Sequence, residues 1–272
     1  MISTDDLNWL LSDFDLGTST AENDPLLESA KIETQQFHDL YWHDRIDIVK
    51  GIKGSGKTAI YRLFFLLREY VIRKNNLYCV FGVEPTGDPI FRLYQAEFEK
   101  FSEIEFENFW SVYFIALVYN LIYTTPQLKI ILTKDLQKID DILENLGLKF
   151  TKNGYSLKES IGAIQKFFQN NKIKFGLETN LDTATAQIKS VSPVIEIDSK
   201  NVEDISRRPI YLASFRDQLA DILGKNKIKI WVMLDRLDEV FPHRSEVEKI
   251  GLRGLLKASY NFSHPNLRTK IF

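Results

Sequence analysis

Cysteine is almost absent from this chain of 272 residues, in which Cys79 is the only one. A single thiol can form neither an intrachain disulfide nor a cysteine-based metal site, so we expect a reducing, cytoplasmic compartment. Cys79 falls within an apolar run, where we expect a buried and unreactive thiol. The four histidines, His38, His43, His243 and His264, show no i, i+4 spacing, and we expect no metal site built from them.

An excess of charge of one sign is also lacking, since the formal net charge is -2. The chain as a whole therefore offers no attraction to nucleic acid or to an anionic membrane, and we expect nucleic acid only through a partner. The N-terminus lacks the basic flank and apolar core of a signal peptide. The most apolar window, residues 112–123, is too short to span a bilayer as a helix and is interrupted by Asn120. We expect it to be a buried helix and expect no contact with a membrane.

The hydrophobic pattern predicts an α/β fold with one sheet. Apolar or β-branched runs predict its strands at residues 45–50, 78–83, 228–234 and 268–272. Apolar residues at helical spacing fill most of the intervening sequence.

Three regions can be distinguished along the chain. Residues 1–43 form a polar leader with short helical pieces, and residues 44–272 form the core. Residues 91–205 are a mostly helical insertion in that core, with a hairpin or irregular β excursion at 172–198. Because the chain stops within its last predicted strand, we expect the C-terminal part of the core to be missing.

A glycine-rich stretch, "GIKGSGKT", follows the first predicted strand. Gly51, Gly56, Lys57 and Thr58 match the phosphate-loop pattern G-x-x-x-x-G-K-[ST] without deviation. A β-branched strand precedes the motif and an apolar helix follows it, which is the context that the motif requires. The alternative is a glycine-rich turn with an incidental lysine. We predict that this loop binds a nucleoside triphosphate.

The residue types of the motif explain its chemistry. A glycine-rich turn directs backbone N–H groups at phosphates, and the N-terminus of the following helix adds its positive dipole end. Lys57 would reach the β- and γ-phosphates, and the hydroxyl of Thr58 would complete the Mg²⁺ shell. The predicted nucleotide-binding residues are Gly51, Lys53, Gly54, Ser55, Gly56, Lys57, Thr58 and Ala59.

A second acidic site follows a buried strand further along the chain. The run "IKIWVMLD" ends in Asp235, which is the Walker B pattern, and we predict that Asp235 holds Mg²⁺ through water. Arg236 comes next, where many ATPases with an extra strand between the two motifs have the glutamate that polarises the attacking water. Asp238 and Glu239 follow in "LDRLDEVF", and either carboxylate could orient the water if the loop folds back. We favour Glu239; the alternative is that both residues cap the next helix.

These two motifs carry a family resemblance. "GIKGSGKT" with a downstream apolar run and "DRLDE" resembles the STAND and KAP branches of the P-loop NTPases. The leader "FDLGTSTAENDPLL" and the stretch "ETQQFHDLYWHDRIDIVKGIKGSGKTAIYRLF" look similar to a set of bacterial P-loop ATPases, several of them associated with defence against phage. The spacing within "VMLDRLDEVFPHRSEVEKIGLRGLLKAS" fits the same set.

The resemblance implies a three-layer α/β/α P-loop NTPase core of the additional-strand type. It also implies ATP rather than GTP as the nucleotide, and control by homo-oligomerisation or by a separate effector protein. In the family a polar sensor residue and further helices follow the last strand, and this sequence stops before them.

Together these features predict a cytoplasmic, Mg²⁺-dependent ATPase, the switch component of a bacterial, anti-phage defence assembly. The catalytic residues would be Lys57, Asp238 and Glu239, and the metal-binding residues Thr58 and Asp235. The alternative is a nucleotide-binding assembly module with negligible turnover that scaffolds a partner effector, which Arg236 favours. A DNA-translocating ATPase fits less well, because basic stripes are lacking.

Overall fold

The computed structural model describes residues 35–42, 44, 46–52, 54–82, 98–145, 172–181, 188–198, 210–237, 240–241 and 245–272. Most of the predicted leader and parts of the predicted insertion lie outside these residues.

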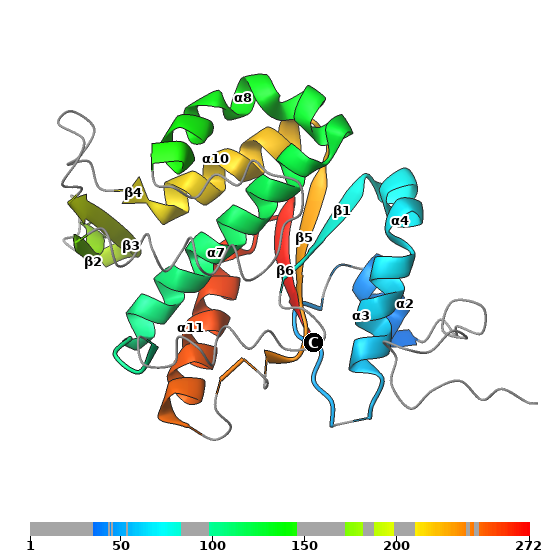
Figure 1. Ribbon diagram of the computed structural model, residues 1–272, viewed down its shortest axis with the longest axis horizontal. Helices are drawn as coiled ribbons and strands as arrows, with labels where there is room; N and C mark the ends of the chain where they lie inside the picture. Colours follow the sequence, from blue (N-terminus) through cyan, green and yellow to red (C-terminus); the bar gives the residue numbers. More distant parts are fainter. Residues whose placement is uncertain are drawn as a thin grey trace, which may run out of the picture.

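A parallel sheet forms the centre of the molecule (Figure 1). It contains β1 (Leu77–Phe81), β5 (Lys229–Leu234) and β6 (Leu267–Ile271), in the order β1-β5-β6. These strands correspond to the predicted strands at 78–83, 228–234 and 268–272. β1 and β5 are short and largely apolar, as expected for parallel strands that are covered on both faces, whereas β6 carries Arg268, Thr269 and Lys270 between two apolar ends.

The first predicted strand, at 45–50, is reduced to a short strand-like segment on the other side of β6. Ile48 forms a parallel bridge with Ile271. The N–H of Val49 donates to the carbonyl of Ile271 at 2.7 Å, and the N–H of Ile271 donates to the carbonyl of Asp47 at 2.8 Å. The order across the sheet is therefore β1, β5, β6 and the segment 46–49. The last strand of the chain is not at an edge but is paired on both sides.

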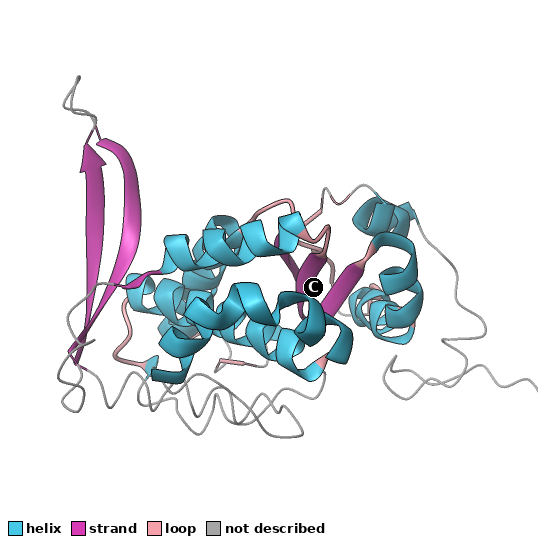
Figure 2. Cartoon of the chain, turned by 90° about the horizontal axis from the view of Figure 1, so that it is seen from above, coloured by secondary structure: helices cyan, strands magenta, loops and turns pink. Residues whose placement is uncertain are grey.

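Helices cover both faces of the sheet (Figure 2). On one face lie α2 (Gln35–Trp42), α3 (Lys57–Leu66) and α4 (Arg68–Asn75). On the other face lie α7 (Glu103–Thr124), α8 (Pro126–Asn145), α10 (Leu212–Lys225) and α11 (Glu246–Phe262).

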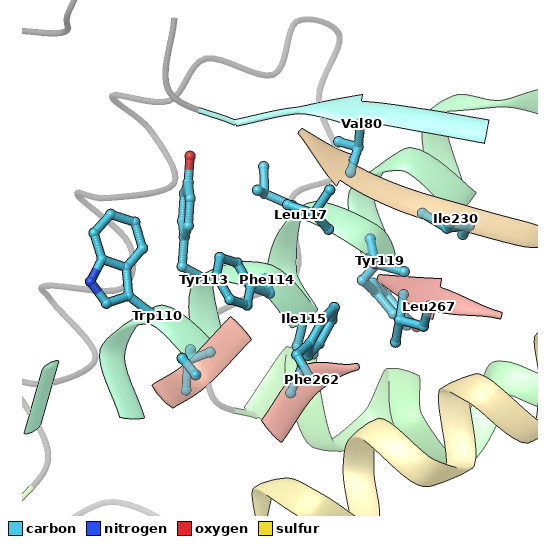
Figure 3. Close-up of a cluster of buried hydrophobic side chains, with 14 of the residues drawn as sticks. Val80, Trp110, Tyr113, Phe114, Ile115, Leu117, Tyr119, Ile230, Phe262 and Leu267 are labelled. Carbon is cyan, nitrogen blue, oxygen red and sulfur yellow. The ribbon is translucent and has the colours of Figure 1, made fainter. Parts of the chain in front are cut away.

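The alternation of side chains along the strands divides the core in two. Trp231 and Met233 of β5 pack with α2, α3 and α4, whereas Ile230 and Val232 pack with α7, α10 and α11. Figure 3 shows part of the second cluster, in which Ile230 and Leu267 of the sheet lie near side chains of α7.

The apolar window at 112–123 lies within α7, and the prediction of a buried helix is confirmed. A capping box starts this helix, since the Ser102 hydroxyl accepts from the Glu105 N–H and the Glu105 carboxylate accepts from the Ser102 N–H. Among the described helices, none is by itself both long enough and apolar enough for a membrane span. Only α7 taken together with residues Pro126–Leu132, at a bend of 101°, meets that test of length and composition.

The β excursion predicted at 172–198 is present as a hairpin. β2 (Lys172–Leu181) pairs antiparallel with β3 (Ile188–Asp198), and the short β4 (Ile210–Tyr211) extends this second sheet. The hairpin stands apart from the central sheet in Figure 2.

Candidate functional site

The two predicted motifs leave the central sheet at the same end, where the carboxyl ends of its strands lie. Ile271 of β6 is aligned with Leu234 of β5 on one side and with Ile48 on the other. Ile48 and Leu234 are thus two strand spacings apart, about 10 Å. Gly51 follows Ile48 by three residues, and Asp235 follows Leu234 directly. In Figure 1 the glycine loop lies below the ends of β5 and β6, where ligands bind in open parallel sheets.

The glycines of the loop have backbone conformations that other residues adopt at a cost. Gly54 and Gly56 have φ angles of 83° and 86°, in the left-handed region. A side chain there would cost about 1–2 kcal/mol at each position. At Gly51 the constraint is space, because a Cβ atom would overlap the hydroxyl of Ser55. The N–H of Ser55 donates to the carbonyl of Ile52 at 3.1 Å and closes the turn.

The helix that follows the loop begins without a side-chain cap. Gly56 is the N-cap of α3, and the first turn of α3 contains no acidic residue. By contrast, Ser102 and Ser245 cap α7 and α11, and glutamates occupy the first turns of both helices. The first N–H groups and the dipole of α3 therefore face the loop without a competing carboxylate, as an anion-binding N-terminus requires.

Lys57 is the first residue of α3, and its side chain reaches back across the loop. Its Nζ donates to the carbonyl of Gly51 at 2.7 Å and to the carbonyl of Ile52 at 3.3 Å. These contacts hold the ammonium group beside the backbone that would surround a phosphate. Buried Tyr61, Leu63 and Phe64 anchor α3 against the sheet, so the helix start has a fixed position.

Asp235 is 2% exposed and directly follows β5. The next residue, Arg236, has a φ of 56°, which is unusual for a residue other than glycine and turns the chain sharply. Beyond it the loop is anchored by the buried side chains of Leu237, Val240 and Phe241. The N–H of Val240 donates to the carbonyl of Leu237 at 3.3 Å.

The structure brings most of the predicted site together. Gly51, Gly54, Ser55 and Gly56 form the loop, whereas Lys57, Thr58 and Ala59 form the first turn of α3. Asp235 lies at the same carboxyl end of the sheet, with β6 between it and the loop. Lys53, Asp238 and Glu239 lie outside the described residues.

An ionic cluster around a buried lysine, beside this site, was missed by the sequence analysis. Lys270, near the C-terminal end of β6, is 0% exposed. Its Nζ lies 2.7 Å from Oδ1 of Asp44 and 3.0 Å from Oδ1 of Asp47, and it donates to the carbonyl of Ile46 at 2.7 Å. Arg268 donates to the carbonyl of Asp44 at 2.8 Å. The available signal was a pair of basic residues in "LRTKIF" and a pair of acidic residues in "HDRID".

Cys79 on β1 is half-buried, so the expectation of a fully buried thiol is wrong, although its pKa is that of an unreactive thiol. Burial raises the pKa of this thiol to about 12, against a smaller opposite effect of the nearby Lys270 charge. Because only the thiolate is a nucleophile, Cys79 is protonated and inert near neutral pH.

Within the described part of the chain, no group of three or more His, Cys, Asp or Glu residues is arranged to hold a metal ion. Mg²⁺ is usually held by one or two protein ligands together with substrate phosphates and water. Asp235 and Thr58 fit that mode of binding, which needs no larger protein cluster.

Searches against protein-family models, curated proteins and solved structures found no match for this chain.

Proposed function

We propose that this chain binds and hydrolyses ATP with Mg²⁺ as a P-loop ATPase. The observation that carries the proposal is the row Ile48, Ile271 and Leu234 across the sheet. It brings the glycine loop and Asp235 to the carboxyl end of the sheet, with one strand, β6, between them. Additional-strand ATPases have an extra strand between their two motifs, and β6 has that position here.

The residues of the site fit a magnesium nucleotide. The left-handed glycines and the uncapped start of α3 suit a phosphate chain. Lys57 exchanges its backbone carbonyl partners for phosphate oxygens. Thr58 and Asp235 hold the metal side of the site, Asp235 through water. Bound Mg²⁺ supplies charge neutralisation on the phosphates.

The hydrolytic step needs a group that orients the attacking water. Arg236 cannot accept a proton at ordinary pH, so the base must come from further along the loop. Glu239, or Asp238 in its place, has this role in our proposal.

The resemblance to bacterial defence-associated ATPases supports the wider role that we propose. In this role the chain is the cytoplasmic ATPase component of an anti-phage assembly, acting as a homo-oligomer or with a separate effector protein. Any contact with nucleic acid is made by that partner.

One observation favours a second function, that of a nucleotide-binding assembly module with negligible turnover. Arg236 replaces the usual adjacent glutamate, and its left-handed backbone turns the chain away from the line of β5. In this alternative ATP stabilises an assembly and is not consumed.

Phosphate release from Mg²⁺-ATP tests the proposal, together with binding of a fluorescent ATP analogue. The variants are Lys57→Ala, Glu239→Gln and Asp238→Asn, with Lys74→Ala as a matched control on the exposed end of α4. We expect Lys57→Ala to abolish binding and turnover. Glu239→Gln should bind normally and lose turnover, and Lys74→Ala should retain both.

Other outcomes discriminate among the alternatives. Loss of turnover with Asp238→Asn, but not with Glu239→Gln, would show that Asp238 orients the attacking water. Tight binding without turnover in the wild-type protein would favour the assembly module. Absence of nucleotide binding in the wild-type protein would contradict both proposals.

A further inference from the structure

We propose that Lys270 is a positioning residue for the glycine loop. It acts through the lead-in segment, which consists of Asp44 and residues 46–49. This inference rests on the proposed nucleotide site, but its test includes a measurement that needs no nucleotide.

The lead-in segment has little backbone support of its own. Among the described residues it has one bridge residue, Ile48, and its two backbone–backbone hydrogen bonds to β6 are both made by Ile271. Ile48 is 52% exposed and Ile52, at the start of the loop, is 83% exposed. Ile46 and Val49 are only partly buried. Ordinary packing therefore holds this segment weakly.

The side chain of Lys270 supplies the missing support. Its ammonium group contacts Asp44, Ile46 and Asp47, which together span the segment just before the bridge. It lies 4.5 Å from the centroid of the Trp231 ring, which covers it from β5. Asp44 has a φ of 48°, a left-handed conformation that persists where its surroundings enforce it.

Charge balance makes this arrangement specific. Lys270 and Arg268 on β6 face Asp44 and Asp47, and a buried charge needs its partners in good geometry. If Lys270 is removed, two carboxylates lose their principal cation and the segment loses three contacts at once. The contact made by Arg268 with the carbonyl of Asp44 remains.

The position of the segment affects the loop directly. Gly51 follows Asp47 by four residues, and its carbonyl accepts the 2.7 Å bond from Lys57. A shift of the segment therefore moves both the start of the loop and the partner of Lys57. Precise placement of a binding group depends on such supporting contacts. Lys270 itself lies within the helix-covered core and contacts the loop only through this segment.

The test compares Lys270→Met with Thr269→Val in the full chain. Thr269 is buried on the same strand and bonds Ser259 of α11, so its loss weakens β6 on the other face. Amide hydrogen exchange of peptides covering 46–57 is measured without nucleotide, and the affinity for the fluorescent ATP analogue is measured separately. Asp47→Asn serves as a milder second variant, since Asp44 still pairs with Lys270.

We expect Lys270→Met to accelerate exchange selectively in residues 46–57 and to weaken analogue binding about tenfold or more, the size typical of losing an outer-shell partner. Asp47→Asn should have smaller effects of the same kind. Thr269→Val should neither accelerate exchange selectively in residues 46–57 nor weaken analogue binding. Selective exchange in a protein that binds no analogue would support the positioning role and contradict only the nucleotide site. If Lys270→Met does not fold, Asp47→Asn decides. Exchange raised evenly over the chain, as with Thr269→Val, would overturn the inference.

Discussion

Nε1 of Trp110 donates a 3.1 Å hydrogen bond to the backbone carbonyl of Gly251, and both groups are buried. The bond joins α7 to α11 at a point where the helices are closely packed. A buried indole N–H needs a partner, so this contact helps to set the position of α11. A small residue is also needed at Gly251 for the packing of the loop after β5, because a Cβ there would overlap the ring of Phe241.

Gly254 has the tightest backbone environment on this face of α11. A Cβ there would lie 2.5 Å from Cβ of Phe106 and 2.8 Å from the backbone nitrogen of Glu107. Since α7 cannot yield locally, we expect Gly254→Ala to lower the free energy of unfolding by about 2 kcal/mol through overpacking. Urea-induced unfolding followed by circular dichroism measures the change.

Gly224→Ala is the control for this substitution. Gly224 lies in α10, where a Cβ would meet only the side-chain oxygen of Asn266 at 3.3 Å. The gain in helix propensity, about 1 kcal/mol, should offset that contact and leave stability near the wild-type value. Equal losses for the two variants would contradict the role of close helix packing.

Two tyrosines of α7 share one carboxylate of α8. The hydroxyls of Tyr119 and Tyr123 each donate to an oxygen of Asp140. Burial, followed by the hydrogen bonds of Tyr119 with Asp140 and with Tyr123, raises the pKa of Tyr119 above its ordinary value. We expect Tyr119→Phe to cost about 2 kcal/mol of stability, because bonds to a charged group are the stronger ones. Chemical denaturation checks this.

The exposed Tyr260 offers the matched control, since it is 83% exposed. Tyr260→Phe should change stability by less than about 0.5 kcal/mol. The raised pKa of Tyr119 also predicts that stability falls as the pH rises above about 10, where unfolded tyrosine ionises and the buried one does not. A shift in stability that is the same for both variants would argue against the shared carboxylate.

Asn108 is a buried amide that makes no hydrogen bond with the described residues, at either Oδ1 or Nδ2. Its replacement by the similarly sized leucine should be neutral or stabilise by about 1 kcal/mol, because no paired partner is lost. Thermal unfolding provides the measurement. For comparison, Nδ2 of Asn266 donates to the carbonyl of Ile228 at 2.9 Å, so Asn266→Leu should destabilise. A large loss with Asn108→Leu would reveal a role for the amide beyond packing.

The Cys79 thiol should resist alkylation in the folded protein. Its pKa of about 12 lies above the unfolded value of about 8.5, so folding favours the protonated form. This contribution to stability is complete below the unfolded pKa and is lost as the pH rises through about 12. Iodoacetamide labelling at pH 8 should be slow in the native protein and fast in urea. Equal labelling rates would contradict a protected, protonated thiol.

The sequence alone allowed the local features of the protein to be predicted. The runs that form β1, β5 and β6 were located to within about two residues, the usual uncertainty of such boundaries. The glycine spacing of the loop and the apolar window of α7 were equally readable. These features are local, since they depend on backbone preferences and on side-chain periodicity over a few residues.

Only the tertiary structure decided which distant segments meet. It inserted β6 between the lead-in segment and β5, and it paired Lys270 with Asp44 across 226 positions. It also packed Gly254 of α11 against α7. Such contacts depend on how the strands are ordered and how the helices cross, and no local periodicity encodes either. The sequence therefore determined the parts of the candidate site, whereas the order of the strands brought them together at the carboxyl end of the sheet.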